Sequence, residues 1–195
     1  MSETLTAGAA RGTEARVLPG VPGIWIFVLM DMGFFAMLFL AFVLERAKQP
    51  ALFAASQEHL NVSLGLFNML VLLTSSWFVA MAVQALRLGR SRLASALLPA
   101  GLACGLVFAA VKVVEYGQKF SVGITPLTDG FFMLYFVLTF LHCLHVIAGV
   151  VVLAVLGLKA RRGAQSVTGV EMGATYWHMV DLLWIMLFPL LYMAR

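Results

Sequence analysis

Residues 172–193 read MGATYWHMVDLLWIMLFPLLYM and hold two ionisable side chains, His178 and Asp181, within an otherwise apolar run. The run has about the 20 residues that a helix needs to cross the hydrocarbon core of a bilayer. His178 and Asp181 lie three residues apart, so they share one face of such a helix. Ionisable groups are costly in lipid and usually face a protein interior, where they mark a site. The stretch therefore predicts a transmembrane helix with one polar face.

The rest of the chain has the same character. Of 195 residues, 62% are hydrophobic and 11% are charged, and the mean hydropathy is +0.97; a soluble domain is roughly a quarter charged. Long stretches with one charge or none predict membrane helices at 23–44, 60–86, 93–116, 130–158 and 172–193. Helix is expected because lipid offers the backbone no other hydrogen-bond partner. We expect an all-α protein whose membrane domain, residues 23–195, is a bundle of five transmembrane helices.

The positions of Lys and Arg predict the orientation of this bundle. Basic residues at 87–92 and at 159–162 fall in two connections that must lie on the same side as the N-terminal segment, residues 1–22. Cytoplasmic connections are enriched in Lys and Arg, so we expect the N-terminus inside, as a flexible cytoplasmic tail, and the C-terminus outside. Topology and anionic lipid then explain the net charge of +4, and no nucleic-acid partner is expected.

The remaining polar side chains can be given depths from the helical rise. Asp31, His178 and Asp181 fall at similar depths in the cytoplasmic half, so we expect them in one layer. His142 and His145, also one turn apart, lie nearer the middle of the fourth helix. Glu115, with Lys112 one turn before it, lies toward the outer end of the third helix, where opposite charges neutralise each other or reach the interface.

The histidines raise the question of haem. Haem ligation in a helical bundle needs imidazoles that converge from facing helices, and His142 or His145 could be paired with His178. The first three helices contain no matching histidine, so we favour imidazoles that hydrogen-bond to neighbouring helices. A membrane haem protein remains a distant alternative. We expect no catalytic residue, no metal ligand and no cofactor-binding residue in this chain.

Two further residue patterns concern the cysteines and the aspartates. Cys104 and Cys143 both fall inside predicted helices and form no Cys-x-x-Cys motif, so we interpret them as small packing residues. Asp31 and Asp181 could serve a small proton-coupled transporter, the other distant alternative. Five helices without an internal repeat or a broken helix fit that class poorly.

Small residues predict where helices pack closely. Gly101 and Gly105 form a small-xxx-small face that allows a neighbouring helix to approach. Gly149 and Gly157, eight residues apart, predict a similar seam on the fourth helix. The run Thr74-Ser75-Ser76 can hydrogen-bond within its own helix or to another helix.

The chain resembles subunit III of the haem-copper oxidases over roughly residues 23–192. The resemblance rests on GIWIFVLMDMGFF at 23–35, HCLHVIAG at 142–149, YWHMVDLLW at 176–184 and the pair Glu115-Tyr116. Within the family, LLTSSWFVA at 72–80 and TPLTDGFFMLYF at 125–136 are closest to the short NorE branch, which is linked with nitric oxide reductase. The resemblance implies a seven-helix relative without its first two helices and with an inside N-terminus.

The resemblance implies a function as well. Subunit III relatives bind no haem or copper, pack against a catalytic subunit that does, hold phospholipid and support proton uptake. We therefore expect a non-catalytic accessory subunit of a nitric oxide reductase in the bacterial inner membrane, with subunit III of an aerobic terminal oxidase as the alternative. Asp31, His178 and Asp181 would form an interhelical hydrogen-bond network. One departure concerns Asp31, where the respiratory oxidases usually have the longer Glu, and the missing helices remove one wall of the lipid cleft.

Overall fold

Five long helices form the protein, and the computed structural model describes them within residues 22–164 and 166–193. Each is long and apolar enough to cross a membrane, which confirms the all-α expectation. They are α1 (Pro22–Lys48), α3 (Val62–Arg87), α4 (Ser91–Ser121), α5 (Gly130–Arg161) and α6 (Val167–Phe188). The expected tail, residues 1–22, lies outside the described residues apart from Pro22.

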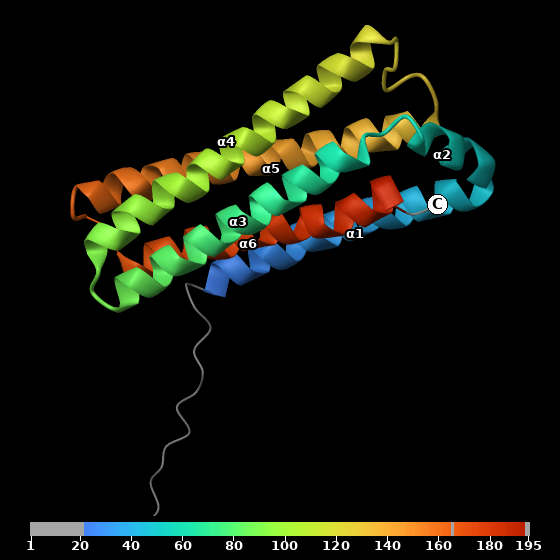
Figure 1. Ribbon diagram of the computed structural model, residues 1–195. Helices are drawn as coiled ribbons and strands as arrows, with labels where there is room; N and C mark the ends of the chain where they lie inside the picture. The colour runs from blue at the N-terminus through green and yellow to red at the C-terminus, as the bar shows by residue number, and fades with distance from the viewer. Residues whose placement is uncertain (1–21, 165, 194–195) are drawn as a thin grey trace, which may run out of the picture.

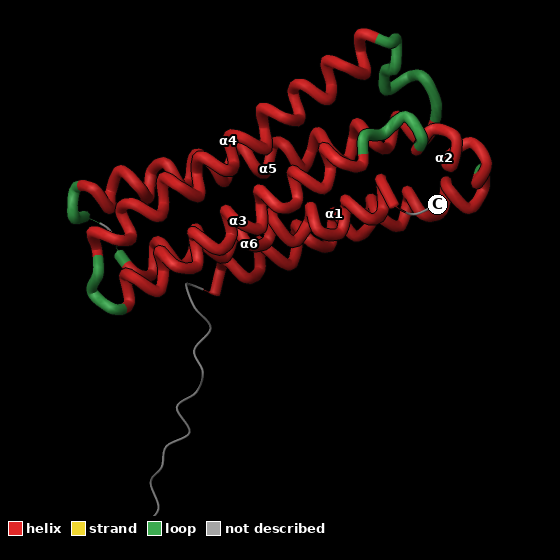
Figure 2. Tube along the Cα trace, viewed as in Figure 1, coloured by secondary structure: helices red, strands yellow, loops and turns green. Residues whose placement is uncertain are grey.

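The helices run side by side, and the connections between them lie at the two ends of the bundle (Figures 1 and 2). Helix α6 is the central element, since it packs against α1, α3 and α5. In its most apolar stretch 56% of the residues are buried within the protein, against 17% for α1. The polar face predicted for residues 172–193 therefore lies where most helices can reach it.

The helix bounds differ from the predicted ones by a few residues, and local chemistry explains the differences. Helix α6 begins at Val167 because the Ser166 side chain accepts a hydrogen bond from the Gly169 backbone N–H. It ends at Phe188, and a π-helical turn, Pro189–Met193, continues the chain. Helix α4 continues past the expected end at residue 116 to Ser121, and it includes the buried Lys119.

The connection between the first two membrane helices contains a short helix that was not predicted, α2 (Pro50–Gln57). Its Phe53 is buried and meets the rings of Phe42 and Phe131 edge to face. Its Gln57 donates a hydrogen bond from Nε2 to the Leu191 carbonyl oxygen at 3.1 Å. Helix α2 therefore closes one end of the bundle, which we call the α2 end.

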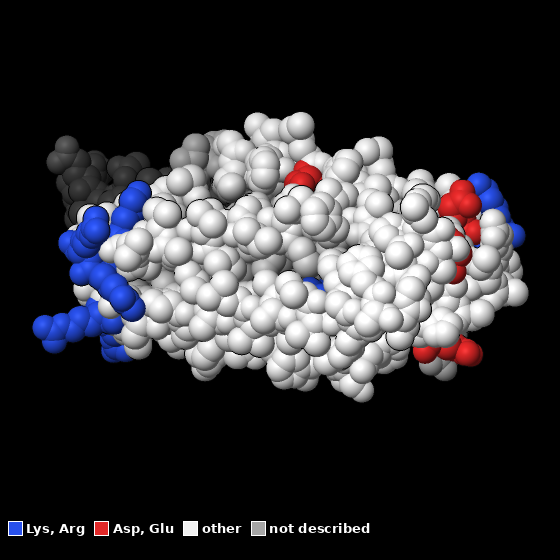
Figure 3. Space-filling view, turned by 90° about the horizontal axis from the view of Figure 1, so that it is seen from above, with Lys and Arg blue, Asp and Glu red and all other residues white. Residues whose placement is uncertain are grey.

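Lys and Arg side chains gather at the opposite end, at the left in Figure 3. This basic end carries the α3–α4 and α5–α6 connections, with Arg87, Arg90, Arg92, Lys159, Arg161 and Arg162. The two basic connections thus lie at one end of the bundle, as the predicted topology requires. An inside position for this end remains a prediction from the positive-inside rule.

Candidate functional site

Asp31 on α1 pairs with His145 on α5, which was not the partner expected for it. Asp31 Oδ1 lies 3.1 Å from His145 Nε2, and His145 Nδ1 lies 2.7 Å from the Leu141 carbonyl oxygen. A carbonyl oxygen only accepts, so Nδ1 carries a proton and donates it. The contact between Nε2 and Asp31 then requires one further proton, held by either group. The pair therefore shares a proton and joins α1 to α5.

Helix α6 reaches the same pair through Tyr176. The Tyr176 hydroxyl donates to the His145 backbone carbonyl oxygen at 3.1 Å, and its ring lies 6.0 Å from that of Phe27 on α1. The Phe35 ring packs edge to face on the His145 imidazole at 5.3 Å. These contacts fix three helices around Asp31 and His145.

His178 and Asp181 lie on the side of α6 that faces α3, and they do not bond to Asp31. His178 Nδ1 is 2.6 Å from the Ser76 hydroxyl oxygen. Asp181 is buried, and neither carboxyl oxygen makes a hydrogen bond to the described residues. The expected network of Asp31, His178 and Asp181 is therefore wrong as a single network. The residues fall into two groups because the faces of α6 at Tyr176 and at His178 point to different neighbours.

His142 lies among aromatic rings. The imidazole packs edge to face on Phe108 at 5.4 Å and lies 5.1 Å from the Trp184 ring. It is fully buried, and neither ring nitrogen has a hydrogen-bond partner among the described residues. Its one-turn neighbour His145 therefore belongs to a different environment, against α1. No group of three or more His, Cys, Asp or Glu side chains within residues 22–164 and 166–193 is arranged to hold a metal ion.

Glu115 and Lys112 neutralise each other, and they do so in the interior of the protein. Their side chains are each 2% exposed, and Lys112 Nζ lies 2.8 Å from Glu115 Oε2. The hydroxyls of Tyr135 and Tyr192 donate to Glu115 Oε1 at 2.8 and 2.7 Å. We call these four residues the tyrosine-capped ion pair. A buried ion pair is tolerated when further hydrogen bonds satisfy its remaining atoms, and here they do.

The lysine of this cluster is held by rings as well as by its counter-charge. Lys112 Nζ lies 5.2 Å from the centre of the Trp184 ring, and at similar distances from two tyrosine rings. It also lies 3.2 Å from the Tyr135 hydroxyl oxygen. Aromatic faces attract a cation, and the attraction grows where water is absent. Sequence reasoning missed Tyr135 and Tyr192, because they lie 20 and 77 residues from Glu115 in the chain.

Two of the predicted packing glycines, Gly105 and Gly149, lie against the same side chain, that of Trp177. A Cβ atom on Gly105 or Gly149 would lie 2.7 or 2.5 Å from the Trp177 ring. The indole N–H donates to the Ser75 hydroxyl at 3.0 Å, and that hydroxyl donates to the Gly101 carbonyl at 2.7 Å. Three of the four predicted packing glycines therefore surround this tryptophan or its partner.

Gly157 is the exception. A Cβ atom there would meet Leu98 and Pro99 at 3.9 Å, an ordinary contact. Gly173 on α6, which was not predicted, packs so closely that a Cβ atom would collide with Leu156. The seam on α5 therefore continues to α6 through Leu156 and does not use Gly157.

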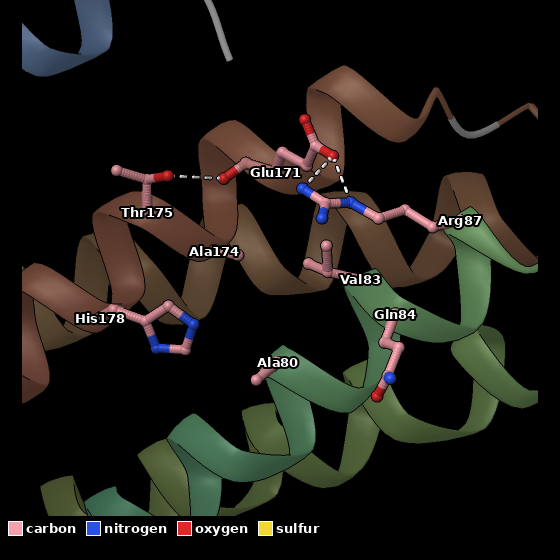
Figure 4. A pocket seen from close by; sticks show the side chains of 8 residues that line it. All are labelled: Ala80, Val83, Gln84, Arg87, Glu171, Ala174, Thr175 and His178. Carbon is pink, nitrogen blue, oxygen red and sulfur yellow. Dashed lines mark hydrogen bonds and ion pairs between the residues drawn. The ribbon is translucent and has the colours of Figure 1, made fainter. Parts of the chain in front are cut away.

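A groove between α3 and α6 opens near the basic end of the molecule (Figure 4). Its volume is about 430 Å³. Arg87 of α3 and Glu171 of α6 form an ion pair at one end of it, at 2.8 Å. His178 lies at the other end and projects from α6 into the space that faces Ala80. The groove thus leads from an exposed ion pair to the imidazole that contacts Ser76.

These features define a class: a five-helix membrane protein with histidine and carboxyl groups buried between its helices. A family model described as cytochrome c oxidase subunit III matches residues 6–194. The chain belongs to the cytochrome c oxidase subunit III family.

Individual relatives agree with this assignment. A cytochrome c oxidase subunit 3 from Synechocystis sp. is 30% identical over 197 residues, which cover 99% of this chain and 83% of the relative. One from Thermostichus vulcanus is 30% identical over 176 residues, covering 88% and 86%. A probable quinol oxidase subunit 3 from Staphylococcus aureus is 26% identical over 174 residues, covering 88% and 87%. The resemblance inferred from the motifs is confirmed at the level of the family.

Proposed function

We propose that this protein is subunit III of an aerobic terminal oxidase, an accessory subunit that packs against a haem-copper catalytic subunit in a bacterial inner membrane. The observation that carries the proposal is the family match over residues 6–194, together with relatives whose names are those of cytochrome c and quinol oxidase subunits. The ionisable side chains between the helices support an accessory role. Asp31 bonds to His145, and Lys112 bonds to Glu115. Further hydrogen bonds join each pair to a neighbouring helix, as expected in a protein that positions helices.

Nitric oxide reductase is the second candidate partner. The stretches at 72–80 and 125–136 favour it, because they resemble the NorE branch. The absence of the first two helices of longer relatives does not favour it. The alignments take in 86% of the Thermostichus protein and 87% of the Staphylococcus protein, so those oxidase subunits are short chains too.

The proposal includes two further expectations about ligands. We expect haem and metal in the partner subunit and none held by this chain. Phospholipid is expected along the apolar outer faces, where many large side chains on α1 are exposed, among them Leu29, Met30 and Met37. Such a face suits either lipid or the apolar surface of another membrane subunit.

Purification of the full-length tagged chain from its own membranes in mild detergent tests the proposal. We expect co-purification of a haem-containing partner that consumes oxygen. Capture of a partner that reduces nitric oxide and not oxygen would replace the first candidate with the second. Capture of no haem protein under conditions that keep other respiratory complexes intact would overturn both. An absorption spectrum of the separated chain, without a Soret band, is the matching control for haem.

A further inference from the structure

The groove between α3 and α6 ends at a side chain that has one bonded and one free ring nitrogen. His178 Nδ1 contacts Ser76, whereas Nε2 makes no hydrogen bond to the described residues, and the ring lies in the wall of the groove (Figure 4). The ring is partly exposed, and the groove opens beside the charged pair Arg87 and Glu171. Water that enters the groove can therefore reach Nε2.

Behind His178, Ser76 stands next to a buried acid. The Ser76 hydroxyl contacts the imidazole, and Asp181 lies one helical turn after His178 on the same face of α6, within reach of that hydroxyl. Asp181 is 3% exposed, and its two oxygens lack a donor among the described residues. If Nδ1–H donates to the Ser76 oxygen, the hydroxyl hydrogen is free to point at Asp181. A buried carboxyl without a donor is the group that gains most from such a proton.

The ion pairs of the neighbouring helices are formed without Asp181 and do not neutralise it. Arg87 of α3 pairs with Glu171 of α6. Lys112 of α4 pairs with Glu115, and on α1 and α5 the pair is Asp31 with His145. Asp181 therefore lies in an apolar interior with Ser76 and His178 as its link to the groove.

We propose that Asp181 is a buried protonation site that exchanges protons with water in the α3–α6 groove through His178 and Ser76. A hydronium ion in the groove gives its proton to Nε2, and the Nδ1 proton passes to the Ser76 oxygen. The Ser76 hydroxyl proton passes in turn to Asp181. The hydronium becomes water, Ser76 keeps one proton, and His178 is left neutral with its proton on Nε2. Rotation or tautomer exchange of the ring restores the starting state.

Infrared spectroscopy of the full-length chain in lipid vesicles tests this relay. The carbonyl band of protonated Asp181 is identified by its loss in Asp181→Asn, and its shift is followed after transfer to deuterated buffer. We expect Ser76→Ala and His178→Phe to slow that shift roughly tenfold or more, because a positioned proton donor commonly contributes at least that much. Ser76→Thr, which keeps the hydroxyl, should preserve the rate.

Ser75→Ala is the matched control. Ser75 is the neighbouring serine, but it bonds to Gly101 and Trp177 and does not face the groove, so the Asp181 rate should stay unchanged. Size-exclusion profiles show whether each variant is folded, and Ser76→Thr against Ser76→Val gives a second pair of closely matched shape. An unchanged rate in both Ser76→Ala and His178→Phe would overturn the proposal. So would the absence of a protonated Asp181 band at every pH at which the protein is folded.

Discussion

The two halves of the bundle treat their buried ionisable groups in different ways. In the half near the α2 end, the oxygens of Glu115 and the ammonium group of Lys112 are bonded to each other and to two tyrosines. In the half near the basic end, His178 and Asp181 keep unbonded atoms, and a groove reaches His178. The tyrosine-capped ion pair, whose polar atoms are bonded, holds helices together. His178 and Asp181 keep unbonded atoms beside a groove, so they are free to exchange protons.

The largest effect is expected where the tyrosine-capped ion pair is broken. Glu115→Gln leaves the Lys112 charge buried without a counter-charge and should lower the free energy of unfolding by about 3–5 kcal/mol. Thermal or denaturant unfolding in detergent measures it. The double variant Glu115→Gln with Lys112→Met should recover much of the loss, since no buried charge remains.

The control for this prediction is the exposed ion pair of Glu45 and Lys48 on α1. Glu45→Gln should change the stability by less than about 1 kcal/mol, since exposed pairs contribute little. Equal losses in the two single variants would show that the tyrosine-capped ion pair is not buried in the folded protein.

The next effect concerns the packing that connects the two halves. Gly149→Ala places a methyl group against the Trp177 ring, where a Cβ atom would lie 2.5 Å away, and should destabilise by about 1–3 kcal/mol. Gly157→Ala lies on the same helix with ordinary contacts at 3.9 Å. It should be neutral or slightly stabilising, because Ala favours helix over Gly by up to about 1 kcal/mol. Similar unfolding curves for the two variants would contradict the close packing of Trp177 against Gly149.

A smaller effect is expected at the pair of Asp31 and His145. Asp31→Leu leaves His145 Nε2 without its partner and should lower the stability by about 1 kcal/mol, the lower part of the range for an unsatisfied group, because the site is partly exposed. Asp31→Asn retains a donor for that nitrogen and should lose less. A loss in Asp31→Leu as large as in Glu115→Gln would remove the difference between the two halves.

The smallest effect is expected at the end of the groove. Arg87 is 56% exposed where it pairs with Glu171, so Arg87→Gln should change the free energy of unfolding by less than about 1 kcal/mol. The same variant should leave the Asp181 exchange rate nearly unchanged, because the relay begins at His178. A large loss of stability would mean that the pair holds α3 and α6 together.

Several elements could be predicted from the chain before its structure. The charge-free stretches predicted the five helices, since membrane helices need only length and apolar composition. Gly101, Gly105 and Gly149 were predicted as packing positions, and the structure gives them tight contacts. The short helix α2 was missed because Phe53 and Gln57 are buried by contacts with residues far along the chain.

The sequence predicted which residues belong to the candidate site, but not which of them bond to each other. Asp31, His145, His178 and Asp181 were recognised because ionisable side chains are rare in apolar helices. Their depths along the membrane helices were the reason for placing Asp31, His178 and Asp181 in one layer. Their partners depend on which face of α6 meets which neighbour, and a rotation of about 100° per residue separates the faces at Tyr176 and at His178 by more than a right angle.

The amino-acid sequence by itself determined that the protein is built for a membrane, how many membrane-spanning helices it has, the family motifs, and which ionisable residues lie within those helices. These follow from composition and spacing, which are local properties. Only the tertiary structure decided that Asp31 pairs with His145, that two distant tyrosines cap Glu115, and that Ser76 contacts His178. The reason is physical: a hydrogen bond requires two atoms about 3 Å apart, and helix packing sets that distance for residues far apart in the chain. The polar stretch at 176–184 marked the site, and the packing of α6 against three helices assigned each of its side chains a partner.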